Sequence, residues 1–404
     1  MKVLYGLPKK ILFCKKTLMS NQRPTSAIEF KHQKKTKKKT IDFDKNGISK
    51  TWYYSRQKKR INWKRREQKL LKLLDKHRGK YGEFDCIVPG SGGKDSCMAS
   101  HTLKFKYDMN PLTVTWPPIL YTKYGYQNYK NWISSGKLSN ICAKRDEQTM
   151  RILTKLSIKN LFHPFQTFIL GQKIFASKIA IKMQIPLIFF GENEAEHGNN
   201  VVDNKIPNRN NKYYAAENLS NLYLSGIKIK ELIDLHQLKE KNLKDFLPTN
   251  LDDIQRLNID QQYLGYYLKW TPQETFYFAV NNGGFLPRPF RTQGTYSKYN
   301  SIDDKIDDLH YYTQFIKFGY GRAHCDVSQE IRNDHLTINE GLKLVKKYDG
   351  EFPDVYFNDV IDYLDIKKSE FFKLTNRFRS PHIWAKIGGE YKLRHTANKD
   401  GVND

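Results

Sequence analysis

The feature that most constrains this chain is a glycine-rich loop placed directly after a short apolar stretch. Residues 84–89 can form a buried strand, and the run Ser91-Gly-Gly-Lys-Asp-Ser96 leads from it into a helix-like segment. Glycines at 90, 92 and 93 let the backbone approach a ligand closely, and the free amides at the start of a helix bind anions. The order strand, loop and helix therefore predicts a site for nucleotide phosphates.

Two common nucleotide loops do not fit this run. A Walker A loop requires Gly-Lys-Ser/Thr, where this chain has Gly93-Lys94-Asp95, and the pattern G-x-G-x-x-G is absent. The pattern S-G-G-x-D-S resembles instead the PP-loop of ATP pyrophosphatases, which split ATP into AMP and pyrophosphate. The resemblance implies that Lys94 and Asp95 are catalytic and that Asp95 is the candidate Mg²⁺ ligand. The residues expected to bind ATP are Ser91, Gly92, Gly93, Asp95 and Ser96.

The sequence around the loop predicts an α/β fold with a parallel sheet. Two further strands are expected at 111–116 and 185–190, with helices between them. The expected helices lie near 95–107, 145–160 and 172–183. Because loops at the carboxyl ends of parallel strands converge on one crevice, the glycine-rich loop should meet the loop that follows residue 190.

Composition divides the chain into three parts. Residues 1–60 form a basic, irregular N-terminal region, residues 61–215 the α/β nucleotide-binding domain, and residues 216–404 a mainly helical substrate or partner region. The polar, Asn-rich stretch 197–215 predicts a loop before the last part. The amphipathic segments that indicate helices there are 228–246, 271–282, 302–317, 337–348 and 366–378.

The net charge of +27 is concentrated at the N-terminus. Residues 1–80 hold 26 of the 69 basic side chains but only 5 of the 42 acidic ones. The body that carries the loop is only mildly basic, which disfavours nucleic acid as the partner. The basic run 31–40 is expected to be a solvated, mobile insertion.

The cysteines predict a reducing compartment. There are five of them, an odd number without close pairs, so a disulfide framework is not expected. No apolar run approaches the ~20 residues that span a bilayer, and residues 1–19 lack an uninterrupted apolar core of a signal peptide. We therefore expect a cytoplasmic protein without a membrane span. The histidines show no metal-ligand spacing.

Further candidate site residues follow the third strand and lie in two later segments. Glu192 and Glu194 come just after residues 185–190, a position suited to Mg²⁺ or to a substrate nitrogen. The segment 291–299 mixes glycine, hydroxyls, aromatics and charges without periodicity, as a substrate loop does. Its candidates are Arg291 and Lys298 for an anion and Tyr296 or Tyr299 for a sugar, and Arg322 is a further cation.

Taken together, these pieces resemble the N-acetyl sugar amidotransferases of surface-polysaccharide and nonulosonic acid biosynthesis. The pieces that carry the resemblance occur in one order, at 84–96, 110–116, 160–173, 188–196 and 291–299. The resemblance implies an ATP-dependent enzyme with Mg²⁺ that converts the acetamido group of a sugar, nucleotide-linked or a nonulosonate, into an acetamidino group. The resemblance implies that the modified sugar is an intermediate in the biosynthesis of lipopolysaccharide O-antigen, pseudaminic acid or legionaminic acid.

The resemblance also implies a partner and reveals one departure. Family members receive ammonia from a separate glutaminase subunit, and no cysteine here lies in a glycine-flanked nucleophile elbow that would make the chain its own glutaminase. Family members often begin with two C-x-x-C pairs that look like a zinc site. Here only Cys14 remains, because Thr17, Ser49 and Trp52 occupy the other places, so no zinc is expected.

Two other functions fit parts of the sequence. A tRNA-modifying PP-loop enzyme could use the basic N-terminus as an RNA arm, but the mildly basic body and the lack of C-x-x-C pairs disfavour it. A catalytically inactive scaffold for a glutaminase is the other alternative. The intact run Ser91–Ser96 disfavours that interpretation.

Overall fold

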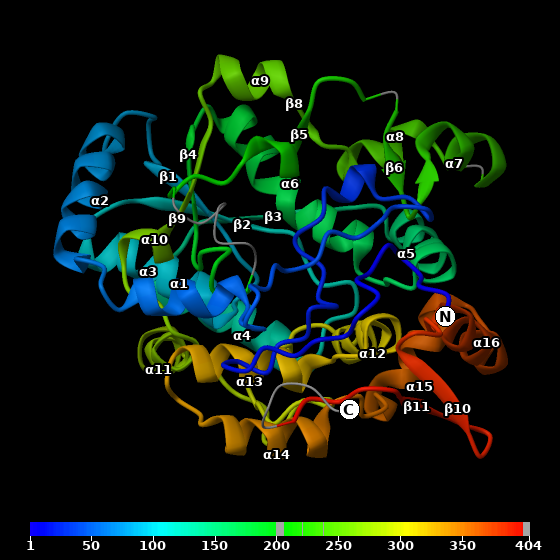
Figure 1. The fold of residues 1–404 in the computed structure, drawn as a ribbon. Helices are drawn as coiled ribbons and strands as arrows, with labels where there is room; N and C mark the ends of the chain where they lie inside the picture. Colours follow the sequence, from blue (N-terminus) through cyan, green and yellow to red (C-terminus); the bar gives the residue numbers. More distant parts are fainter. Residues whose placement is uncertain (199–205, 220, 237, 399–404) are drawn as a thin grey trace.

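The centre of the molecule is a five-stranded parallel sheet. The computed structural model describes residues 1–198, 206–219, 221–236 and 238–398. The strands are β1 (Cys86–Pro89), β2 (Pro111–Thr115), β3 (Asn140–Cys142), β4 (Leu187–Phe190) and β9 (Asp260–Tyr263). They pair in the order β3-β2-β1-β4-β9, and every pair is parallel (Figure 1). The predicted α/β fold class is confirmed.

Alternating side chains explain why these short strands are buried on both faces. In β1, Ile87 packs with α6 (Gln166–Met183), whereas Cys86 and Val88 face α2 (Trp63–His77) and α3 (Lys94–His101). Successive side chains of a strand point to opposite faces, and helices cover both of them. The sheet is therefore the rigid layer on which the glycine-rich loop is mounted.

The other helices surround this layer and build the C-terminal half. Those before residue 260 are α1 (Lys50–Lys58), α4 (Lys123–Gly136), α5 (Glu147–Leu161), α7 (Ile229–His236), α8 (Glu240–Leu243) and α9 (Leu251–Arg256). Those after it are α10 (Leu264–Tyr267), α11 (Pro272–Gly283), α12 (Asp307–Phe318), α13 (Arg322–Arg332), α14 (Ile338–Tyr348), α15 (Asp354–Leu364) and α16 (Lys368–Phe378). A hairpin of β10 (Trp384–Ile387) and β11 (Glu390–Leu393) follows.

Every helix and strand that the sequence predicts is present, and the structure adds several that it did not predict. The helices α13 and α15 and the strand β9 were missed, and the sheet extends past residue 215 because β9 is its edge strand. Strand β9 consists of Asp-Gln-Gln-Tyr and lacks the apolar run by which buried strands are recognised in a sequence. Of the predicted loop 197–215, residues 199–205 lie outside the described residues.

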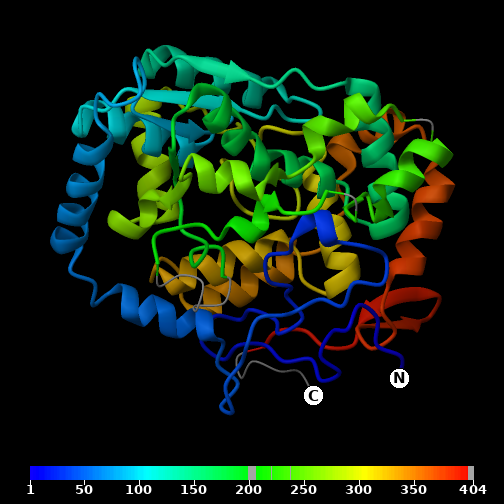
Figure 2. The same cartoon turned by 90° about the horizontal axis from the view of Figure 1, so that it is seen from above.

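The N-terminal lobe, residues 1–49, lies across the front of the molecule as a chain of turns and isolated bridges (Figure 2). The basic run 31–40 is largely exposed, as a solvated segment should be, but it is joined to the rest of the lobe. Backbone hydrogen bonds tie it to the lobe, from Lys38 N to Tyr5 O at 2.7 Å and from Thr25 N to Lys39 O at 2.8 Å. Lys38 turns inward and contacts His32, so the lobe has a defined wall toward the interior.

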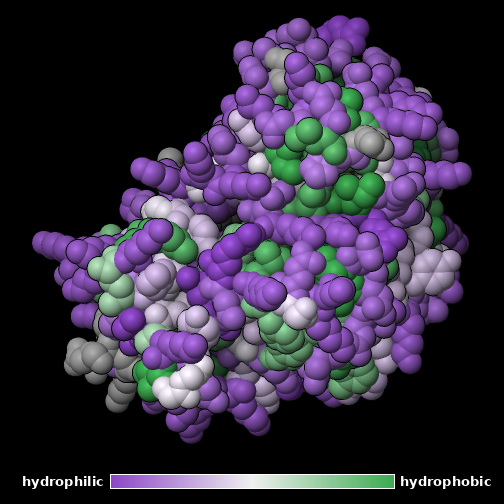
Figure 3. All heavy atoms as spheres, turned by 90° about the vertical axis from the view of Figure 1, so that its right-hand side faces the viewer, coloured by the Kyte–Doolittle hydropathy of each residue, from purple (hydrophilic) through white to green (hydrophobic). Residues whose placement is uncertain are grey.

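The face on the right-hand side of Figure 1 is mostly hydrophilic, with apolar atoms in separate patches (Figure 3). This agrees with a mean hydropathy of −0.70. Among the described residues, no helix has both the length and the apolar character that a membrane crossing requires.

The packing of α11 on α3 supplies the first prediction. Gly283 ends α11, and a Cβ added there would lie 2.1 Å from Cys97 Sγ of α3. We expect Gly283→Ala to lower the free energy of unfolding by about 1–3 kcal/mol, because overpacking forces the helices apart. In the Cys97→Ala background the same change should cost much less. Chemical denaturation of the four proteins measures this coupling, and equal costs in both backgrounds would exclude the contact.

Candidate active site

The glycine-rich loop has the geometry of an anion cradle. Gly92 has a φ of +86°, and a Cβ there would lie 2.5 Å from the backbone of Tyr129, so only glycine fits. Gly93 is the N-cap of α3, with a φ of −71°. Among the described residues, none accepts a hydrogen bond from the backbone N–H of Ser91, Gly92 or Gly93. These donors and the N-terminus of α3 are therefore available to a ligand.

Side chains of the loop fix its shape from both sides. Ser96 Oγ donates to Gly93 O at 2.9 Å, which closes the turn into α3. Ser91 Oγ donates to Asp303 Oδ2 at 3.0 Å, and Asp303 belongs to the C-terminal half. The segment 302–317, predicted from the sequence as a helix, thus contacts the glycine-rich loop through Asp303.

Asp95 is held in place by two donors. Lys94 Nζ lies 2.6 Å from Asp95 Oδ2, and Trp270 Nε1 donates to Oδ1 at 2.9 Å. Burial raises the pKa of Asp95, and the charge of Lys94 opposes that shift, whereas Glu192 adds to it. The two donors fix the orientation of the Asp95 carboxylate, but Lys94 does not fully offset the cost of burying its charge. A bound cation would offset the remaining cost, so the position suits a ligand of a metal ion.

A cavity of about 320 Å³ opens at the carboxyl ends of β1, β2 and β4. The glycine-rich loop contributes Ser91, Gly93, Asp95 and Ser96 to its lining. The charged and titratable side chains of the lining are Lys173, Glu192, Glu194, His197 and Arg209, and the apolar ones include Val114, Trp116, Ile169, Phe175 and Phe190. A cavity that combines phosphate donors with apolar surface suits a nucleotide.

Both predicted glutamates line this cavity. His197 Nε2 lies 2.8 Å from Glu192 Oε1. Burial opposes the ionisation of Glu192, but the hydrogen bond and charge of His197 and the charge of Lys94 outweigh it and lower the Glu192 pKa to about 2. Glu194 accepts from Ser26 Oγ at 2.9 Å and from Tyr263 OH at 3.2 Å. Glu192 thus stays ionised opposite Asp95.

A second cavity, of about 660 Å³, shares the glycine-rich loop with the first. One wall is a face of α12, which contributes Asp307, His310, Tyr311, Gln314 and Lys317. Asp307 and Lys317 are ten residues apart, about 15 Å along the helix. The N-terminal lobe supplies the opposite wall through residues 23–27. The cavity therefore extends along most of α12, and the glycine-rich loop forms part of its lining.

Of the three cations predicted to bind the substrate anion, Arg291, Lys298 and Arg322, the structure brings Arg322 alone to these cavities. Arg322 lines the larger one, where its Nε donates to Asp326 Oδ1 at 2.8 Å and its Nη1 to Ser301 Oγ at 2.8 Å. Arg291 instead forms a bidentate pair with Glu351, with both N–O distances 2.6 Å. That pair satisfies the guanidinium within the protein.

Two other predicted residues of this segment also point elsewhere. Lys298 is exposed, and neither it nor Tyr296 lines either cavity. The hydroxyl of Tyr296 is buried without a hydrogen-bond partner among the described residues, and burial raises its pKa. The aperiodic composition of 291–299 indicated an irregular segment, but it could not indicate which of its side chains face inward.

Several residues of the site were not predicted. Lys173 lines both cavities, and burial lowers its pKa even though Glu29 opposes the shift. The available signal was a lysine within an otherwise apolar stretch of α6, but the helix has two further lysines, Lys178 and Lys182, so the sequence did not single out Lys173. Trp270 and Asp307 had none, because each becomes part of the site only through long-range packing.

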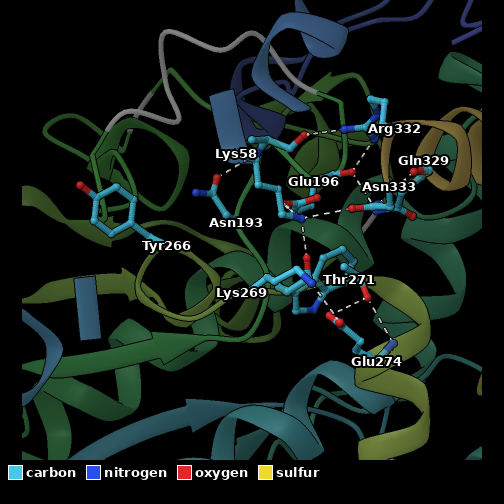
Figure 4. A network of polar contacts seen from close by, with 12 residues as sticks. Lys58, Asn193, Glu196, Tyr266, Lys269, Thr271, Glu274, Gln329, Arg332 and Asn333 are labelled. Atoms are coloured by element: carbon cyan, nitrogen blue, oxygen red, sulfur yellow. Dashed lines mark hydrogen bonds and ion pairs between the residues drawn. The ribbon is translucent and has the colours of Figure 1, made fainter. Parts of the chain in front are cut away.

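A buried network holds the loop after β4 against helices from both ends of the chain (Figure 4). Lys58 of α1 forms an ion pair with Glu196, with an Nζ–Oε1 distance of 2.7 Å. Lys58 also donates to the carbonyl oxygen of Trp270 at 2.5 Å, and Arg332 of α13 donates to the carbonyl oxygen of Glu196 at 2.7 Å. Because Trp270 also binds Asp95, the network connects the loop after β4 to the glycine-rich loop.

The N-terminal lobe keeps two turns where zinc-binding pairs were considered. Cys14 Sγ accepts a hydrogen bond from Ser49 N at 3.3 Å, and Ser49 Oγ lies 2.8 Å from Thr51 Oγ1. All five cysteines are free. Within the described parts of the chain, no group of three or more His, Cys, Asp or Glu side chains could hold a metal ion.

Comparison with known proteins links the C-terminal part to a family. Residues 293–397 match the family model for the LPS biosynthesis protein WbpG-like, C-terminal domain. Among solved structures, the chain is similar to the U34-tRNA thiolase NcsA from Methanococcus maripaludis with its 4Fe-4S cluster, at 12% identity over 81% of this chain and 94% of that chain, with a TM-score of 0.32. That likeness is too distant to support a function. No curated protein matches the chain.

The loop geometry supplies the second prediction. Gly92→Ala places a methyl group 2.5 Å from the backbone of Tyr129 at a positive φ, whereas a Cβ at Gly93 meets no atom within 4 Å. We expect Gly92→Ala to lower the melting temperature and to abolish pyrophosphate binding. Gly93→Ala should leave the melting temperature unchanged, so it is the matched control for folding. Differential scanning calorimetry and titration calorimetry with pyrophosphate test this, and equal stability of the two variants would contradict the assigned loop geometry.

Proposed function

We infer that the chain is a PP-loop enzyme that uses ATP and is linked to lipopolysaccharide biosynthesis, an interpretation supported by the glycine-rich loop on a parallel sheet and by the WbpG-like match over 293–397. We propose that it is an amidotransferase that converts the acetamido group of a sugar into an acetamidino group. In this proposal ATP adenylates the amide oxygen, and ammonia from a separate glutaminase subunit then displaces AMP. The sugar is nucleotide-linked or a nonulosonate, and the reaction takes place in the cytoplasm.

One observation carries the proposal. The larger cavity is lined both by the glycine-rich loop and by residues of the WbpG-like region, such as Asp303 and Arg322. A nucleotide in the smaller cavity would place its phosphates at that shared loop, facing the larger cavity. A second substrate in the larger cavity can then reach the α-phosphorus, which is the geometry that adenylation requires.

The chemistry assigns roles to the residues at the loop. An amide carbon is a poor electrophile, and adenylation of its oxygen creates a good leaving group. We assign Ser91, Gly92, Gly93 and Ser96 to the phosphates, and Lys94 and Asp95 to the transfer step. Asp95 and Glu192 both line the smaller cavity and provide the carboxylate oxygens that Mg²⁺ prefers. When bound, Mg²⁺ would neutralise charge on the departing pyrophosphate.

The test incubates the protein with ATP, Mg²⁺, ammonium salt and a panel of nucleotide-linked acetamido sugars and nonulosonates. We expect AMP and a sugar product lighter by about one mass unit in mass spectrometry, because NH replaces oxygen. Asp95→Asn should lower AMP formation by about a hundredfold or more, since the charge that orients the pyrophosphate is lost. It keeps the shape that accepts from Trp270, so the melting temperature should change little.

Ammonium should support the reaction and glutamine alone should not. Amidine formation from glutamine would show that the chain holds its own glutaminase site. Full turnover by Asp95→Asn would remove Asp95 from the mechanism. The tRNA-modification alternative predicts a salt-sensitive RNA that co-purifies with the protein, and an absorbance ratio typical of pure protein would count against it.

A pair of arginine variants separates substrate contact from structure. We expect Arg322→Ala to raise the sugar KM by roughly tenfold or more, the loss of a charge-assisted contact, without changing ATP affinity. Arg291→Ala removes the pair with Glu351 and should lower stability while leaving KM within a few fold. Steady-state kinetics and thermal unfolding measure both effects. A raised KM in Arg291→Ala, with an unchanged KM in Arg322→Ala, would show that Arg291 and not Arg322 binds the substrate anion.

A further inference from the structure

Asp307 is a buried carboxyl group that faces the larger cavity without a partner. It lies in the first turn of α12 and is only 9% exposed. Among the described residues, none donates a hydrogen bond to its carboxylate or forms an ion pair with it. Buried polar groups in native proteins are nearly always paired. An unpaired one that faces a cavity is therefore an acceptor for a ligand group.

The neighbours of Asp307 do not explain it as a structural residue. Asp304, three residues earlier, accepts the backbone N–H groups of Ile119 at 2.5 Å and Ile306 at 2.9 Å, and thereby anchors the segment. Asp308 is directed to Arg288, with a closest N–O distance of 3.9 Å, and lines neither cavity. Asp307 has neither kind of contact.

Asp307 also lies on the side of the cavity where the glycine-rich loop is anchored. Asp303, four residues before it, accepts a hydrogen bond from Ser91. Arg322, the candidate for the substrate anion, acts on Asp307 electrostatically and lines the same cavity. A sugar held between Arg322 and the loop would lie next to this wall.

We propose that Asp307 accepts the proton of the acetamido N–H while the amide oxygen is adenylated, a role that rests on the proposed function. The amide oxygen attacks the α-phosphorus, the bond from that phosphorus to the pyrophosphate oxygen breaks, and the N–H proton passes to the carboxylate. The products are an O-adenylyl imidate whose nitrogen is uncharged and whose phosphate remains anionic, pyrophosphate, and protonated Asp307. Without a proton acceptor, the nitrogen would keep a positive charge that draws electrons from the attacking oxygen.

The same proton can serve the second step. Protonated Asp307 returns it to the imidate nitrogen, which makes the carbon more electrophilic. Ammonia attacks that carbon, AMP leaves with the electron pair of the C–O bond, and one ammonia proton passes to the regenerated carboxylate. The product is the amidinium ion, and the proton on Asp307 is released to water, so one proton is released per cycle.

The electrostatic surroundings favour such a shuttle. Burial raises the pKa of Asp307 well above its usual range, and the charges of Asp303, Asp304 and Asp308 add to the shift, whereas Arg322 opposes it. A raised pKa brings a carboxyl group nearer the pH at which it both takes and returns a proton. Asp307 acts as a base only when ionised, so the adenylation rate should rise with pH through its raised pKa and level off above it.

The test isolates adenylation from the ammonia step. Labelled pyrophosphate is exchanged into ATP without ammonium, in the presence of the panel sugar that supports wild-type amidine formation. We expect Asp307→Asn to lower the exchange rate by about a hundredfold or more and to lose the rise with pH. Asp307→Glu should restore part of the rate. Asp308→Asn is the matched control, because it makes the same chemical change in the same helical turn, away from the cavity.

Each outcome decides a different point. Exchange by Asp307→Asn at the rate of Asp308→Asn, or an unchanged pH profile, would overturn the role of Asp307 and leave the proposed function intact. Loss of ATP affinity in Asp307→Asn but not in Asp308→Asn would also overturn it, because the residue would then support the nucleotide. Absence of both exchange and amidine in the wild type with every panel sugar would reject the proposed function itself.

Discussion

The buried ion pair between Lys58 and Glu196 is the contact on which the site depends. Its two side chains are 9% and 2% exposed, and removing either would leave an uncompensated charge in the interior. Glu196 lies in the same loop as Glu192 and Glu194, and Lys58 also binds the carbonyl oxygen of Trp270, whose indole N–H binds Asp95. Residues from the N-terminal helix, the sheet and the C-terminal half are thereby fixed relative to one another. The sheet fixes the position of the glycine-rich loop, and the Lys58–Glu196 pair fixes the positions of the loop after β4 and of Trp270 relative to it.

The carboxyl groups around the loop differ in their electrostatic surroundings. Glu192 lies beside His197 and Lys94, which keep it ionised. For Asp304 and Asp307, burial and the charge of Asp303 raise the pKa, that of Asp304 to about 7. Asp95 is intermediate, because burial raises its pKa and the charge of Lys94 opposes the shift. In the proposed reaction, the ionised Glu192 suits contact with a cation on the nucleotide, whereas Asp307 suits proton exchange with an amide.

The sequence predicted the parts that depend on local order and missed those that depend on long-range packing. The loop Ser91–Ser96, its strand and its helix follow from residues adjacent in the chain, and the structure has them. Strand β9 escaped prediction because Asp260-Gln-Gln-Tyr263 lacks the apolar run of a central strand, and an edge position makes that tolerable. Arg291 and Arg322 looked equivalent in sequence. Only the tertiary structure shows that Arg291 pairs with Glu351 outside both cavities, whereas Arg322, although paired with Asp326, lines the larger cavity.

The N-terminal lobe has a consequence for how an activated intermediate would survive. Residues 23–27 and Lys38 form one wall of the larger cavity, although they lie far in sequence from the glycine-rich loop. An adenylated amide reacts with water as well as with ammonia, and enclosure is how a protein favours the scarcer nucleophile. In the proposed reaction this wall would shield the adenylated amide from water, so the lobe would determine the yield of product per ATP.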